Sequence, residues 1–163
     1  MDFVREHVSD TVSEPVDIVI TSSAGAPLDA TFYQSVKGMT AALPIIKHNG
    51  TIIIAAECGE GLGSPEFCRL VRETRDMEVF MTNILRDDYF VIDQWQFEEF
   101  AKVLRKAEVY LFSSGITKND QSKMLVTHVE SVEAGINMAL QKHGQDAKIA
   151  VIPRGPYVLA ELV

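Results

Sequence analysis

Cysteine and clustered histidine are both scarce in this sequence. Cys58 and Cys68 are the only two cysteines, and they lie ten positions apart, a spacing that fits no zinc-binding pattern. The four histidines are scattered, with no pair at the helical spacing of metal ligands. We therefore expect two reduced thiols in a cytoplasmic protein and no metal site within this chain.

Long apolar runs and basic runs are absent as well. No run approaches the roughly 20 apolar residues that a membrane-spanning helix needs, and the segment Met1–His7 is too charged for a signal peptide. Lysine and arginine total 15 against 23 acidic residues, for a net charge of −8. This balance disfavours a nucleic-acid partner, because it supplies no basic surface for phosphates. We expect neither a membrane nor a nucleic acid as partner.

What the sequence does contain is enough apolar material for one folded domain. Its 163 residues are 47% hydrophobic and 23% charged, a globular composition that needs no disulfide or metal to hold a core. Residues 1–15 are polar and end at a proline, so we interpret them as a lead-in segment. Residues 16–163 are expected to form a single α/β domain.

Four short apolar runs predict the strands. They are rich in β-branched residues and hardly alternate with polar ones, which is typical of strands covered on both faces of a parallel sheet. The runs are Val16–Ile20, Thr51–Ala56, Glu108–Phe112 and Lys148–Ile152. Helical patterns separate them, so the sequence predicts a three-layer, Rossmann-like α/β sandwich around a mainly parallel sheet of four to five strands.

Two helices are predicted in the first half of the chain. The first follows Pro27 and shows an apolar stripe with the 3.6-residue period of an α-helix. The second is expected to begin at Ser64 and Pro65, because proline is favoured at the first helical position. The stripe of the first helix is Leu28, Phe32, Val36, Met39 and Leu43.

Two further helices are predicted in the second half. One begins at Asp93, where Asp93 and Gln96 have the spacing of a capping box. The other begins near Thr127, is capped with Glu130, and ends before Gly144, since glycine is favoured just past a helix C-terminus.

Ligands of open parallel sheets bind at the carboxyl ends of the strands, which points to three loops, 21–27, 57–63 and 113–117. The first loop is small and polar and precedes a helix, so it suits an anion, although an ordinary turn is the favoured interpretation. The second loop has three glycines but lacks the full spacing of a dinucleotide fingerprint. We reject a Rossmann cofactor site there and expect close approach of a backbone, a substrate or another domain.

The first predicted helix has an unusual outer face. Opposite Phe32, the helical period places Gln34 and Lys37 together among small residues, with Tyr33 at the edge. A cation and an amide that converge on one point suit a carboxylate. The alternative is a solvated lysine beside a glutamine, and spacing alone favours that alternative slightly.

Two other residues are candidates for the same surface. Trp95, the only tryptophan, lies in the first turn of the third helix and off its apolar stripe, so it needs a ligand, a second domain or a neighbouring loop as partner. Arg154 follows the last strand and could face the site, although a lone arginine is more often structural.

Several stretches of the chain carry a resemblance to a known family. They are Asp17–Ser23, Pro27–Asp29, Tyr33–Met39, Asp93–Trp95 and Ile152-Pro153 with Gly155. Together, from about Pro15 onward, they resemble the C-terminal domain of the nickel-dependent lactate racemase family, and the run that begins at Tyr33 is the most specific part.

The resemblance implies two α/β domains with the active site in the cleft between them. The cofactor it implies is a nickel pincer on a pyridinium mononucleotide, which takes a hydride from a small 2-hydroxy acid and returns it to either face. The N-terminal domain would supply the covalent lysine and the histidines. In this chain Gln34 and Lys37 would contact the substrate carboxylate or the cofactor, Tyr33 would lie beside them, and Trp95 would line the cleft.

This sequence has no histidine cluster of the N-terminal type, so the N-terminal catalytic domain is missing from it. We expect the chain to be inactive alone and to bind no cofactor alone, and homodimerisation through the exposed cleft face is a further expectation. A stand-alone module for a small anion is the first alternative, and a purely structural or oligomerisation domain is the second.

Overall fold

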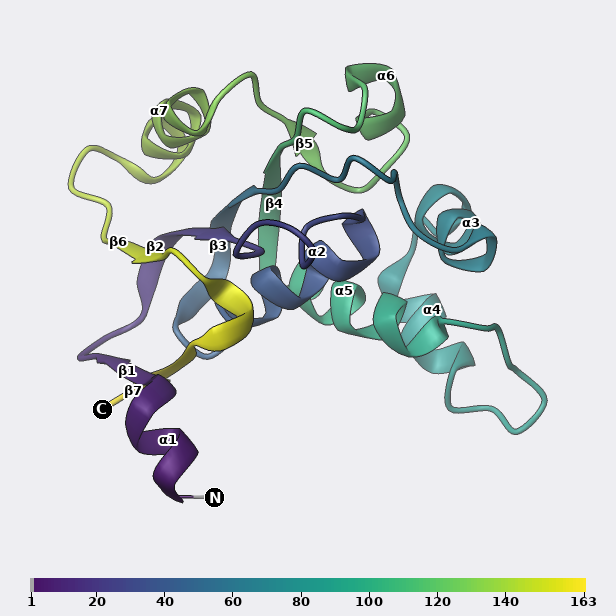
Figure 1. The fold of residues 1–163 in the computed structure, drawn as a ribbon, viewed down its shortest axis with the longest axis horizontal. Helices are drawn as coiled ribbons and strands as arrows, with labels where there is room; N and C mark the ends of the chain where they lie inside the picture. The colour runs from purple at the N-terminus through teal and green to yellow at the C-terminus, as the bar shows by residue number, and fades with distance from the viewer. Residues whose placement is uncertain (1) are drawn as a thin grey trace.

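The computed structural model describes residues 2–163, with side chains from Arg5 onward, and Met1 lies outside the described residues. Its elements alternate between helices and strands along most of the chain (Figure 1). In chain order they are α1 (Asp2–Val8), β1 (Ser9–Val12), β2 (Val16–Ser22), α2 (Phe32–Thr40), β3 (Ile46–Ala55), α3 (Pro65–Glu73), α4 (Met77–Asn83), α5 (Gln94–Lys106), β4 (Ala107–Phe112), α6 (Lys118–Gln121), β5 (Thr127–His128), α7 (Val132–His143), β6 (Ile149–Ile152), the 3-10 helix η1 (Gly155–Tyr157) and β7 (Leu159–Leu162).

A parallel sheet of five strands forms the centre, in the order β5-β4-β3-β2-β6. The predicted α/β class and parallel sheet are confirmed, and the four predicted runs supply β2, β3, β4 and β6. The fifth strand corrects a predicted helix start, because Thr127 and His128 pair with β4. The last helix begins at Val132 instead, where the Ser131 hydroxyl accepts the Ala134 N–H. Gly144 ends this helix with a positive φ, as predicted.

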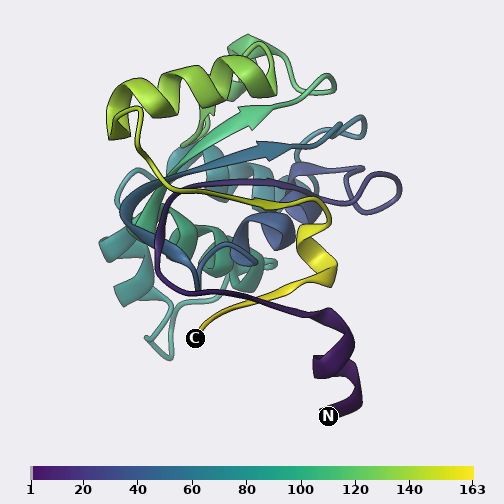
Figure 2. The same ribbon diagram turned by 90° about the vertical axis from the view of Figure 1, so that its left-hand side faces the viewer.

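Helices cover both faces of the sheet, so the fold has three layers (Figure 2). Helix α7 covers one face, where Ile18 and Ile53 pack beneath it. Helices α2, α3 and α5 cover the other face, over Val19 and Ile52. This second core is the larger, and it fixes the positions of α2 and α5 relative to each other.

The first predicted helix begins later than expected. Residues 27–30 form turns whose N–H groups bond back to Gly25 and Pro27, and α2 begins only at Phe32, after Thr31 caps the Gln34 N–H. The predicted apolar stripe includes Leu28, so the sequence pattern did not indicate that turns precede the helix. The second predicted helix begins at Pro65 with Ser64 as its cap, as expected. Helix α4 has no counterpart in the prediction, because Phe80 is its only buried residue.

The strand β6 departs from the expectation of burial on both faces. It lies at the edge of the sheet, where Ile149 and Val151 are 40% and 62% exposed. Beside it, β1 of the lead-in segment pairs in parallel with β7 near the end of the chain, while α1 projects away from the body (Figure 2).

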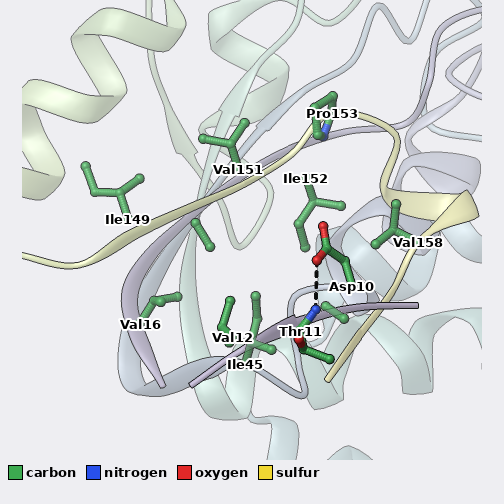
Figure 3. A pocket seen from close by; sticks show the side chains of 12 residues that line it. Asp10, Thr11, Val12, Val16, Ile45, Ile149, Val151, Ile152, Pro153 and Val158 are labelled. Carbon is green, nitrogen blue, oxygen red and sulfur yellow. Dashed lines mark hydrogen bonds between the residues drawn. The ribbon is translucent and has the colours of Figure 1, made fainter. Parts of the chain in front are cut away.

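A mostly apolar groove of about 240 Å³ lies between the edge strand β6 and the two-stranded sheet of β1 and β7 (Figure 3).

Cys58 and Cys68 are free thiols, as predicted. Between residues 2 and 163, every helix is too short or too polar to cross a membrane.

Candidate functional site

The candidate site lies at the carboxyl edge of the sheet. Helix α2 follows the loop that leaves the carboxyl end of β2, so its first turns lie at this edge. Helix α5 runs directly into the amino end of β4 at Ala107, and its 13 residues place its first turn about 20 Å away, at the same carboxyl edge. The two helices pack against each other, which brings their first turns together.

The outer face of α2 carries the predicted cation–amide pair. Phe32, Val36 and Met39 are fully buried beneath the helix, while Lys37 is exposed on the opposite side. The Lys37 ammonium donates a hydrogen bond to Gln34 Oε1 over 2.7 Å. Both side chains therefore end at one point in solvent, with ammonium and amide N–H groups left for an anion.

The aromatic part of the site lies beside this pair. The rings of Tyr33 and Trp95 meet edge to face, with centroids 5.9 Å apart, and Tyr33 packs in the same way on Phe67 of α3 at 5.1 Å. Trp95 is 52% exposed. Tyr33 and Gln34 thus lie in the first turn of α2, Lys37 lies one turn further along it, and Trp95 lies in the first turn of α5 against the Tyr33 ring. The roles of these four residues in binding stay predictions.

The predicted capping box at Asp93 is wrong. Asp93 precedes α5 with a left-handed backbone, φ 64°, and its carboxylate makes no capping hydrogen bond. It accepts instead from the Ser64 hydroxyl at 2.5 Å and from the Tyr33 hydroxyl at 3.4 Å. Gln96 is buried, and its side-chain N–H group donates to the Tyr33 carbonyl at 2.7 Å. These long-range contacts leave no signal in the spacing of residues, and only the Asp93–Trp95 motif marks the segment.

Burial raises the pKa of the Tyr33 hydroxyl, and the negative charge and hydrogen bond of Asp93 raise it further. Tyr33 therefore stays protonated at neutral pH and acts as a hydrogen-bond donor to Asp93.

The loop 21–27 has little capacity left for an anion. Its three hydroxyls donate to backbone carbonyls of other segments, from Thr21 to Gly38, from Ser22 to Pro153 and from Ser23 to Ser35. The first N–H groups of α2 are also used, from Phe32 to the Gly61 carbonyl, from Tyr33 to the Leu62 carbonyl and from Gln34 to the Thr31 hydroxyl. These bonds use the hydroxyl and helix N–H donors that the loop would offer to an anion, whereas Lys37, the other part of the stand-alone anion module, is exposed.

The glycine loop 57–63 packs against the start of α2. Its carbonyls accept the N–H groups of α2, and a Cβ at Gly63 would lie 2.8 Å from the Cβ of Tyr33. Of the three glycines, only Gly63 is approached this closely, since nothing lies within 4 Å of a Cβ added at Gly61.

Arg154 follows β6 at the same edge. It is exposed and, within the described residues, forms no ion pair. The next residue, Gly155, packs so closely on α2 that an added Cβ would lie 2.8 Å from Gly38 Cα. Arg154 therefore flanks the helix that carries Lys37.

The residues present do not fit a metal ion. Over residues 5–163, no three His, Cys, Asp or Glu side chains gather in a way that could hold one. The Gln34–Lys37 pair fits an anionic oxygen group, such as a carboxylate or a phosphate.

The fold and this edge define a parallel α/β domain that exposes a cation–amide pair beside two aromatic rings. Residues 11–160 match the sequence profile of the lactate racemase C-terminal domain. The chain belongs to this family. It is 37% identical to a lactate racemase of Thermoanaerobacterium thermosaccharolyticum over 160 residues, and 32% identical to one of Lactiplantibacillus plantarum over 162 residues.

Solved structures agree with this assignment. The lactate racemase apoprotein from T. thermosaccharolyticum superimposes with a TM-score of 0.90 at 36% identity, covering 98% of this chain and 39% of that one. A Thermotoga maritima protein at 12% identity, with a TM-score of 0.61 over 96% of this chain and 39% of its own, shares the fold. The matches to the two lactate racemase sequences include 97% and 98% of this chain. They include only 37% and 38% of the relatives' own lengths, so the chain spans less than half of either relative.

Proposed function

We propose that this chain is the C-terminal, substrate- and cofactor-covering domain of a nickel-pincer-dependent racemase or epimerase of small 2-hydroxy acids, and that it is inactive by itself. The observation that carries the proposal is the Lys37–Gln34 pair on an exposed helix face beside Tyr33 and Trp95. Two relatives that cover nearly the whole chain are lactate racemases, which supports this class of substrate.

The chemistry of the pair matches that substrate class. An ammonium group and an amide that share one point can bind a carboxylate through charge-assisted hydrogen bonds, which are stronger than bonds between neutral groups. The rings of Tyr33 and Trp95, called the Tyr33–Trp95 wall, form an apolar surface beside the pair, which would shield one side of the ligand from water and limit the size of the group beyond the carboxylate. A carboxylate with a short side chain is the ligand that this combination favours.

A nickel pincer on a pyridinium mononucleotide would supply, when bound, the acceptance and return of the α-hydrogen. Gln34 and Lys37 would hold the carboxylate of the substrate or an anionic group of the cofactor, and Trp95 would close the site against solvent. The acid–base groups and the metal ligands would come from an N-terminal catalytic domain. We place the domain boundary after residue 15 and the protein in the cytoplasm, and we keep homodimerisation as a prediction.

A hybrid enzyme tests the proposal directly. It joins this chain to the upstream part of the T. thermosaccharolyticum lactate racemase, which the chain does not match, in place of the matching part. Loaded with the nickel-pincer cofactor, the hybrid is supplied with single enantiomers of a panel of 2-hydroxy acids, and racemisation is followed by chiral chromatography. The controls are each half alone under the same conditions.

We expect turnover by the hybrid only, with the preferred hydroxy acid identifying the substrate class. A hybrid that binds the cofactor but racemises no hydroxy acid would contradict the proposal. Turnover by the upstream part alone, at the rate of the hybrid, would contradict a role for this chain.

A further inference from the structure

We infer that Asp93 is a positioning residue that fixes the Tyr33–Trp95 wall of the site. Its carboxylate does so by accepting hydrogen bonds from the hydroxyls of Tyr33 and Ser64. The inference rests on the proposed function for its consequence in turnover, whereas the geometry of the network is independent of it. Asp93 itself contacts neither Gln34 nor Lys37 through any hydrogen bond among the described residues.

The network ties three helices at their first turns. One carboxylate oxygen of Asp93 accepts from Ser64, which caps α3, and the other accepts from Tyr33 in the first turn of α2. Asp93 itself is the residue that precedes α5. A single carboxylate thus joins the starts of α2, α3 and α5. No other side chain among residues 5–163 links these three starts through its hydrogen bonds.

The backbone of Asp93 indicates that this use of the carboxylate has a cost. Its φ of 64° lies in the left-handed region, which disfavours residues other than glycine, although aspartate and asparagine tolerate it best. The side chain also gives up the capping bond that it would otherwise make to its own helix. Strain of this kind persists where the surrounding contacts over-determine the conformation, which is common at binding sites.

Tyr33 has partners at its hydroxyl, its backbone carbonyl and its ring. Its hydroxyl is bound by Asp93, its carbonyl by Gln96 of α5, and its ring by Phe67 and Trp95. Trp95 follows Asp93 by two residues, so the same turn that places the carboxylate also places the indole against the Tyr33 ring. Loss of the carboxylate therefore removes one restraint on Tyr33 and loosens the contact between the two rings, while the buried stripe of α5 stays intact.

Fluorescence of this chain alone tests the geometry, because Trp95 is its only tryptophan. In Asp93→Asn we expect faster local motion in the anisotropy decay of Trp95 and stronger quenching by acrylamide. The control is Asp88→Asn, because Asp88 is exposed and pairs only with Arg86. Unchanged Trp95 motion and quenching in Asp93→Asn, equal to the control, would overturn the inference.

A pH titration of the same emission adds a signature that a general loss of stability does not produce. Ionised tyrosine quenches a neighbouring tryptophan, and the Tyr33 ring lies 5.9 Å from Trp95. Asp93 is the charged group that raises the pKa of Tyr33, so Asp93→Asn is expected to move the quenching midpoint to lower pH. Tyr33→Phe is expected to remove this phase, and circular dichroism follows the fold throughout. A midpoint that stays in place or rises would contradict the contact.

The hybrid enzyme then tests the consequence for turnover. Misplacing groups that orient a substrate lowers kcat strongly, so we expect kcat of Asp93→Asn to fall roughly 10- to 100-fold, with a much smaller change in KM. An Asp93→Asn hybrid with wild-type kcat would contradict the positioning role. Failure of the unchanged hybrid to racemise any hydroxy acid would contradict the proposed function instead. The fluorescence test of Asp93 does not depend on that outcome, because it uses this chain alone.

Discussion

At the scale of single residues, the site depends as much on missing side chains as on present ones. Gly38 lies one residue after Lys37 and faces the carboxyl end of β2, where an added Cβ would come within 2.7 Å of the Ser22 carbonyl oxygen. On its other side it touches Gly155. The helix that carries Gln34 and Lys37 can approach the end of the sheet only because position 38 has no side chain.

The substitution Gly38→Ala is therefore expected to destabilise the protein. Alanine usually favours a helix over glycine by about 1 kcal/mol, but here the methyl group would meet backbone that cannot move aside. Overpacking of this kind costs about 1–3 kcal/mol, so we expect a net loss of unfolding free energy in urea denaturation.

Gly135, the fourth residue of α7, provides the matched control. Its added Cβ would lie 3.2 Å from a methyl group of Ile53, a side chain that can shift, so Gly135→Ala is expected to cost less than Gly38→Ala. Equal stability of Gly38→Ala and the unchanged protein would contradict the close approach of α2 to β2.

Sequence reasoning at this scale succeeded for residues that act within one helix. The 3.6-residue period places Gln34 and Lys37 on one face, and the structure joins them by a hydrogen bond. It failed for Asp93, because a cap is a local pattern whereas the bonds from Tyr33 and Ser64 come from positions 60 and 29 residues away. Such partners become visible only when the helices are packed.

At the scale of elements, the strands with both faces covered were the most predictable. Continuous β-branched runs identify β2, β3 and β4, since burial on both faces demands apolar residues at every position. The two-residue strand β5 and the helix α4 escaped prediction. The first is too short to show a period, and the second buries only Phe80.

The pairing of β2 with its neighbours is reinforced by one carboxylate. Asp17 accepts a hydrogen bond from Lys47 of β3 at 2.7 Å and another from the Lys148 N–H just before β6 at 2.9 Å. The bond from Lys47, followed by that from Lys148, holds the pKa of Asp17 below its ordinary value of 3.8. A carboxylate with a lowered pKa stabilises the folded state above its ordinary pKa, and this stabilisation is lost as pH falls through the folded value.

We therefore expect Asp17→Asn to lower the unfolding free energy at pH 7 and at pH 5, and to lower it less at pH values below 3.8. Urea denaturation of both proteins at each pH gives this difference. Lys47→Met is the partner control, because it removes the largest cause of the shift and is expected to weaken the pH dependence. A constant difference between the Asp17→Asn and unchanged proteins across the whole range would contradict the role of Asp17.

At the scale of the whole molecule, the two edges of the sheet differ in character. The carboxyl edge of the strands gathers the polar and aromatic candidate site, whereas the free edge beside β6 exposes Ile149 and Val151 next to an apolar groove (Figure 3). The family and the parallel architecture followed from the sequence alone. The pairing of β1 with β7 did not, because it joins the two ends of the chain without a local signal.

The molecule also covers only part of its relatives, whose matched portions are 37% and 38% of their lengths. Within the described residues no metal-binding cluster occurs, and Lys37 of the Lys37–Gln34 pair is exposed. These features agree with the proposal that this face completes a site together with another domain.

The measurement that tests this account most directly is kcat/KM for racemisation by the hybrid enzyme carrying Lys37→Ala. Lys142→Ala is the control, because Lys142 pairs with Glu108 at the amino end of β4, away from the site. We expect Lys37→Ala to lose on the order of 100-fold in kcat/KM, the equivalent of a lost charge-assisted hydrogen bond, with unchanged stability, since Lys37 is exposed. Lys142→Ala is expected to retain full activity. Equal kcat/KM for Lys37→Ala and the unchanged hybrid would contradict the claim that this face binds the substrate or its cofactor.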